Sequence, residues 1–165
     1  MALNFPDNPV DGDQIAEGNS TWIYNASKTV WNLLEGILNV EKVQLIGTAS
    51  NIYNVDVVSN QIVFVTGNAT SDWTINIRAS ESGTFNNAIA IGETITIVFI
   101  AKQGSSIGYY NNIFQIDNVT QTVLWIDGDG PTSGTVNGID SYSFSIIKTN
   151  ANTYTVLGSV APFLT

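Results

Sequence analysis

Histidine, the commonest general base and metal ligand of proteins, is absent from this 165-residue chain, and so is cysteine. Mechanisms that need an imidazole or a thiolate, including Ser-His-Asp hydrolysis and zinc-bound water, are therefore excluded. Carboxylates remain as proton-transfer groups, as in glycoside hydrolases. The candidate pairs are Asp127 with Asp129 and Glu81 with Glu93, but their spacing marks no acid and base. Because acidic residues in Gly-rich segments usually form solvated turns, we predict that the chain is not an enzyme.

Two acidic turns, Asp11-Gly12-Asp13 and Asp127-Gly128-Asp129-Gly130, contain oxygen ligands of the kind that calcium prefers. The complete calcium-loop pattern needs further acceptors and a distal Glu, whereas Pro131 follows the second turn. We therefore predict no metal and no other cofactor. Calcium binding at the 127–129 loop stays open as the alternative.

Aromatic residues are the candidate contact groups, namely Trp22, Tyr24, Trp31, Tyr109 and Tyr110. The first three fit a sugar-stacking platform, because flat rings bind pyranose faces. They fit better as the core of a very small sheet. The two tyrosines fit either exposed contacts or the entry to a strand.

Residues 1–32 are predicted to form a small β-meander. A turn with two prolines, at Pro6 and Pro9, is followed by short strands near 14–17, 20–24 and 29–32, with turn residues between them. Since side chains alternate along paired strands, Trp22, Tyr24 and Trp31 should share one face. Residues 33–50 match both helix and strand patterns, and we interpret them as a connector.

Residues 51–165 show repeated alternation of apolar and polar side chains, clearest at 73–78, 95–99 and 142–146. Roughly eight short strands at this spacing predict an antiparallel β-sandwich or jelly roll, so the fold class is all-β. The expected buried residues are Trp73, Ile75, Ile77, Ile95, Ile97, Phe99, Phe114, Phe144 and Ile146.

The net charge is −9, and the only cationic side chains are Arg78 and four lysines. We therefore expect no nucleic-acid partner. No apolar stretch is long enough to span a bilayer, and the first residues lack the basic start and apolar run of a secretory signal, so we expect no membrane association. Charged residues are 12 % of the chain, against about 25 % in typical proteins. Such a surface suits a protein packed against neighbours.

The string 5–12, which reads Phe-Pro-Asp-Asn-Pro-Val-Asp-Gly, is followed by Trp22-Ile23-Tyr24-Asn25 and by Val30-Trp31. This Pro-x-x-Pro-x-x-Gly turn, Tyr-containing strand and terminal Trp resemble a short module of virion structural proteins from tailed marine bacteriophages, particularly cyanophages. Segments 75–79, 92–96, 109–112 and 141–144 resemble a domain that recurs in such proteins. These families carry no catalytic residues that could be transferred.

The resemblance implies a virion location after assembly in the host cytoplasm, with other virion proteins as partners. We expect a capsid decoration or a short appendage or fibre component whose residues 1–32 dock on the particle. The alternatives are a tail-fibre tip that recognises host surface glycans and, less well supported, a carboxylate-dependent depolymerase. Few lysines and prolines are available to protect strand edges, so we also expect a homo-oligomer, with a trimer favoured.

Overall fold

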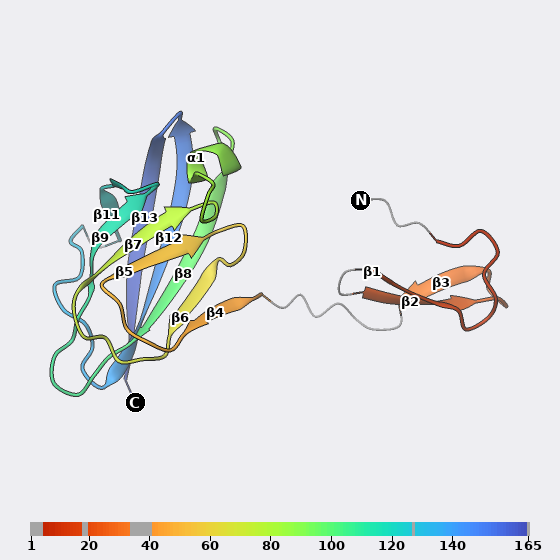
Figure 1. The fold of residues 1–165 in the computed structure, drawn as a ribbon, viewed down its shortest axis with the longest axis horizontal. Coiled ribbons are helices and arrows are strands. Elements are labelled where there is room, and N and C mark those ends of the chain that lie inside the picture. Colours follow the sequence, from red (N-terminus) through yellow and green to blue (C-terminus); the bar gives the residue numbers. More distant parts are fainter. Residues whose placement is uncertain (1–4, 18–19, 34–40, 127, 165) are drawn as a thin grey trace. The chain divides into compact units, whose positions relative to one another are not determined.

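A computed structural model describes residues 5–17, 20–33, 41–126 and 128–164. The chain divides into two compact units, residues 1–40 and 41–165 (Figure 1). Each unit has its own sheets, and each is described by itself below.

The first unit is a three-stranded antiparallel meander in the order β1-β2-β3. Its strands are β1 (Gln14–Glu17), β2 (Ser20–Asn25) and β3 (Val30–Leu33). The predicted sequence of turn and short strands in this zone is therefore confirmed.

The described residues of the second unit form a four-stranded sheet, a six-stranded sheet and one short helix, α1 (Phe85–Ala88). The four-stranded sheet has the order β10 (Val119–Thr120), β9 (Asn111–Ile116), β7 (Trp73–Arg78) and β5 (Ile52–Asp56). The six-stranded sheet has the order β11 (Val123–Trp125), β13 (Thr153–Leu164), β12 (Gly138–Asn150), β8 (Thr94–Lys102), β6 (Ile62–Val65) and β4 (Val43–Ile46).

Between β4 and β9 the chain passes alternately from one sheet to the other, so that successive strands within each sheet run parallel. The long β12–β13 hairpin then adds antiparallel strands beside β8. The chain is all-β apart from α1 in its described part, but the prediction of wholly antiparallel sheets is wrong. Alternating side chains occur in strands of either direction, and direction here depends on which sheet receives the intervening strand.

Part of the predicted connector over 33–50 is also strand. Val43–Ile46 form β4, which pairs in parallel with β6 at the edge of the six-stranded sheet. Exposed Val43 and Leu45 alternate there with half-buried Gln44 and Ile46, as an edge strand requires. Leu33 is the last residue of β3, and residues 34–40 of the connector lie outside the described residues.

The two sheets of the second unit share one core. Phe114 from the four-stranded sheet and Phe144 from the six-stranded sheet have ring centroids 4.5 Å apart, and Tyr53 and Phe99 make a similar contact at 5.0 Å. Of the nine residues predicted to be buried, eight are buried. Ile95 is the exception, because it is half-buried and packs against the margin of the core.

The face of β5 and β7 turned away from the core carries a ladder of polar pairs. Asn76 is buried there and donates from Nδ2 to Asn54 Oδ1 at 2.9 Å and to Asn118 Oδ1 at 3.0 Å. Two residues along the strands, the Arg78 guanidinium donates to the Asp56 carboxylate, and this hydrogen bond raises the pKa of Arg78. Directly paired residues of parallel strands thus satisfy one another on this face.

Candidate functional site

The aromatic residues of the first unit gather on one face of the meander. Tyr24 on β2 lies opposite Trp31 on β3, with ring centroids 5.3 Å apart. Phe5 stacks on Trp31 at 5.0 Å and presents an edge contact to Trp22 at 5.9 Å. All four rings are half-buried. The predicted common face is confirmed, and Phe5, which the sequence pattern placed only in the turn, completes the cluster.

The turn that precedes this cluster is hydrogen-bonded to the β2–β3 hairpin. The Asp11 carboxylate accepts from the Ala26 N–H at 2.8 Å. Backbone hydrogen bonds join Gly12 N to Tyr24 O at 3.0 Å and Tyr24 N to Asp13 O at 2.8 Å. The residues that carry the Pro-x-x-Pro-x-x-Gly pattern and those that carry the aromatic pattern therefore form one hydrogen-bonded module.

Tyr109 and Tyr110 belong to the second unit, in the segment between β8 and β9, and they have different surroundings. The backbone of Tyr109 is bracketed by Gln103, which donates to its carbonyl at 2.8 Å and accepts from its N–H at 3.0 Å. The Tyr109 side chain packs against the core. The Tyr110 N–H donates to Asp72, and its side chain lines a surface groove. Tyr109 borders a different surface hollow, together with Ala69, Thr70 and residues 104–107, so both candidates lie at hollowed surfaces.

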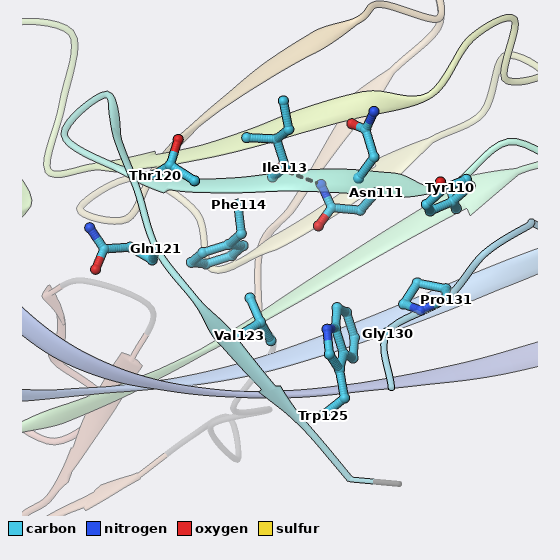
Figure 2. A pocket seen from close by; sticks show the side chains of 11 residues that line it. Tyr110, Asn111, Ile113, Phe114, Thr120, Gln121, Val123, Trp125, Gly130 and Pro131 are labelled. Carbon is cyan, nitrogen blue, oxygen red and sulfur yellow. Dashed lines mark hydrogen bonds between the residues drawn. The ribbon is translucent and has the colours of Figure 1, made fainter. Parts of the chain in front are cut away.

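This groove lies between β9, the β10–β11 segment and residues 130–131 (Figure 2). Its volume is about 190 Å³, below the roughly 300–1,000 Å³ of pockets that enclose whole small molecules. It therefore has room for a fragment the size of one ring, with the remainder of a ligand outside. The lining residues are Tyr110, Asn111, Asn112, Ile113, Phe114, Thr120, Gln121, Val123, Trp125, Gly130 and Pro131.

Trp125 is the largest side chain of the groove, and two glycines hold its indole. A Cβ atom on Gly130 would lie 2.6 Å from Trp125 Nε1, and one on Gly158 would lie 3.0 Å from the six-membered ring of the indole. The edge of the ring meets Phe144, with centroids 5.9 Å apart. Sequence analysis missed Trp125 as a contact residue. The available signal was a tryptophan followed closely by the glycine-rich segment 128–130.

The polar side chains of the groove can orient a ligand but not all are free to do so. The buried Asn111 amide donates to the carbonyls of Trp73 and Ile113, so its donors are already used. Thr120 and Asn112 are exposed and face solvent at the groove. No carboxylate is among the described residues that line the groove. The lining thus combines aromatic side chains with neutral hydrogen-bonding groups, a set suited to an uncharged polar ligand rather than to an ion.

Three of the four predicted acidic candidates, Glu81, Glu93 and Asp129, lie among the described residues. Glu93 accepts from the Ala90 N–H at 2.8 Å in a turn, and Glu81 and Asp129 are exposed. Asp127 lies outside the described residues, so the 127–129 calcium alternative is not addressed. Within the described ranges, no group of three His, Cys, Asp or Glu side chains is placed to hold a metal ion.

Two charged side chains near α1, the half-buried Asp117 and the buried Lys148, also hold the fold. Asp117 accepts from the N–H groups of Phe85 and Asn86, at 2.7 and 3.0 Å, at the start of α1. The buried Lys148 ammonium donates to the carbonyls of Asn86 and Ile89. Both groups therefore position the short helix that follows β7.

None of the helical residues that the structure describes forms a segment with the length and apolar character needed to cross a bilayer. Comparisons of the chain with protein-family models, with curated proteins and with solved structures found no match.

Proposed function

We propose that this chain is a non-enzymatic structural protein of a bacteriophage particle, either a capsid decoration protein or a short appendage component at the particle surface. The first unit attaches the chain to another virion protein. The second unit, a two-layer β-sandwich of mixed strand direction, stands as a rigid block. The protein is assembled in the host cytoplasm and functions in the virion.

The observation that supports this proposal is that all the residues that resemble the phage module lie within the first unit, residues 1–40. The turn and the aromatic residues that resemble the phage module belong to one hydrogen-bonded unit of their own, separate from the core of residues 41–165. A small unit with its own sheet and ring cluster is suited to serve as a docking module, because it needs no contact with the second unit to keep its shape.

Attachment can be tested with phage particles produced without the chain. Full-length protein should bind these particles, whereas protein lacking residues 1–40 should not. The shortened protein should keep the unfolding midpoint of the second unit in urea, because the core lies within residues 41–165. Normal occupancy by the shortened protein would contradict the docking role. Binding of neither protein to particles would contradict the virion assignment itself.

A second candidate function is recognition of host surface glycans, and the groove at Trp125 favours it. Three aromatic residues line it, Tyr110, Phe114 and Trp125. Tyr110 and Trp125, with the exposed polar side chains, would provide the stacking surface and neutral hydrogen bonds that a sugar ring uses. The groove volume of about 190 Å³ fits one ring of a longer polysaccharide.

For this candidate, Trp125→Ala is expected to weaken binding to immobilised bacterial lipopolysaccharide or capsular polysaccharide by about tenfold or more, as is usual for loss of a stacking aromatic. Ile126→Ala is the matched control, because Ile126 is adjacent, 80 % exposed and outside the groove lining. Equal binding by the wild-type protein and both variants would exclude the groove as a glycan site.

A further inference from the structure

The turn that leads into β12 contains the single Asn-Gly pair of the sequence, Asn137-Gly138. In such a pair the backbone nitrogen of the glycine can attack the side-chain amide carbon of the asparagine. The new carbon–nitrogen bond closes a succinimide ring, and the side-chain nitrogen leaves as ammonia with the proton of the attacking nitrogen. Water then opens the ring to aspartate or isoaspartate. Because glycine has no side chain to hinder the attack, Asn137 is the asparagine whose sequence most favours this deamidation.

The fold requires both residues of this reactive pair. Asn137 has a φ of 60°, in the left-handed region that asparagine tolerates better than most residues other than glycine. A Cβ atom on Gly138 would lie 2.5 Å from the Phe163 carbonyl oxygen on β13 and 2.8 Å from Thr135 Cγ2. Most replacements at either position would therefore be strained, and the geometry of the turn itself explains why a chemically labile pair stands here.

The same turn holds the attacking nitrogen in an unreactive state. The Gly138 N–H donates to the Thr135 carbonyl at 2.9 Å, and the Gly138 carbonyl accepts from the Gln103 N–H at 3.0 Å. Gly138 is buried. The attack requires the nitrogen to give up its proton to a base from solvent, and a buried, hydrogen-bonded N–H is protected from such a base, as slow amide exchange shows. Deamidation therefore requires the turn to open.

Asp140 fastens this turn from within the fold. Its carboxylate is 2 % exposed and accepts from the Thr135 N–H at 3.0 Å and from Gln103 Nε2 at 2.8 Å. Thr135 and Gln103 are also the two residues whose backbone groups hold Gly138. Both partners of Gly138 are thus fixed by one carboxylate, and losing it would loosen the turn without removing any contact of the aromatic core.

We infer that Asn137 is a site of spontaneous deamidation that the native turn keeps closed, and that Asp140 controls its opening. The reaction needs only water and converts a neutral amide into a carboxylate. Asn137 lines a surface hollow with Asn68, Lys102 and Ser105, and Lys102 is the charged residue of that described lining. The product would therefore add a negative charge to this hollow. The inference does not depend on the virion assignment or on the groove at Trp125.

Mass spectrometry of the full-length protein during incubation at mildly alkaline pH tests the inference. In urea, Asn137 should gain one mass unit at the rate of a synthetic peptide covering residues 133–142. The native protein should react on the order of a hundredfold more slowly, because the turn is rarely open. Asp140→Ala should quicken the reaction of the native protein about tenfold, through loss of the hydrogen bonds that close the turn.

Phe144→Leu is the matched control. Phe144 is on the same strand and fully buried, so its replacement removes core contacts but keeps the hydrogen bonds of the turn, and deamidation should stay near the wild-type rate. Asp140→Asn, which keeps one side-chain oxygen, should lie between wild type and Asp140→Ala, and it supplies the measurement if Asp140→Ala fails to fold.

Three outcomes would overturn the inference. Reaction in urea mainly at another asparagine, located by fragmentation of the peptides, would overturn the site. A native protein that deamidates as fast as the synthetic peptide would overturn the protection. Wild-type rates in both Asp140 variants, or equal acceleration by Phe144→Leu and Asp140→Ala, would overturn the control by Asp140.

Discussion

Replacing Trp73 by alanine is expected to lower the free energy of unfolding by about 3–5 kcal/mol, the range seen for large aromatic residues in cores. Trp73 is 1 % exposed and contacts Tyr53, Phe99 and Tyr142 with ring centroids at 6.4, 6.0 and 5.9 Å. These partners come from both sheets, so the cavity left by alanine is bounded by two hydrogen-bonded layers that cannot collapse into it. Urea denaturation followed by circular dichroism measures the loss.

Trp73→Phe provides the matched control. The Trp73 Nε1–H is buried and finds no acceptor in the part of the chain that the structure describes. Phenylalanine keeps most of the ring contacts and removes this unpaired donor, whose burial costs about 1–3 kcal/mol. We therefore expect Trp73→Phe to lose less than half as much stability as Trp73→Ala. Equal losses for the two variants would contradict the packing argument.

The buried residues of the second unit could be predicted because strand alternation is a local property. Trp73, Ile75 and Ile77 alternate with Thr74 and Arg78 in the sequence, and the same alternation places them in the core. The shared face of Trp22, Tyr24 and Trp31 followed in the same way from strand spacing and a short turn. In both cases residues close together in the sequence were sufficient to predict which side chains share a face.

Strand direction and the groove could not be predicted, because both depend on distant parts of the chain. Whether β7 pairs in parallel with β5 depends on β6 joining the other sheet, and no local pattern encodes that choice. The position of Trp125 depends on Gly158, which is 33 residues away and faces it only because β11 pairs with β13. Sequence spacing alone gave Trp125 the appearance of an ordinary strand residue.

One buried carboxylate, that of Asp140, holds the segments around Tyr109 and Thr135. Replacing it is the second substitution for which we expect a large loss of stability. Asp140 is 2 % exposed and accepts from Gln103 Nε2 at 2.8 Å and from the Thr135 N–H at 3.0 Å. Gln103, itself 3 % exposed, brackets the backbone of Tyr109. A single side chain on β12 thus fixes two loops, and the first of these leads to Tyr110 at the groove.

Asp140→Ala is therefore expected to lower the free energy of unfolding by about 2–4 kcal/mol, because it leaves a buried Gln103 donor and the part-buried Thr135 N–H without this acceptor. Asp140→Asn keeps a side-chain oxygen at the same place and should lose about half as much. Urea denaturation gives the two losses. Amide hydrogen exchange should in addition quicken at Tyr109 and Thr135 in Asp140→Ala while the amides of β7 stay protected, since the loops open locally and the core does not. Unchanged exchange at both loop amides would show that the loops are held by other contacts, and Asp140 would then have no part in shaping the groove.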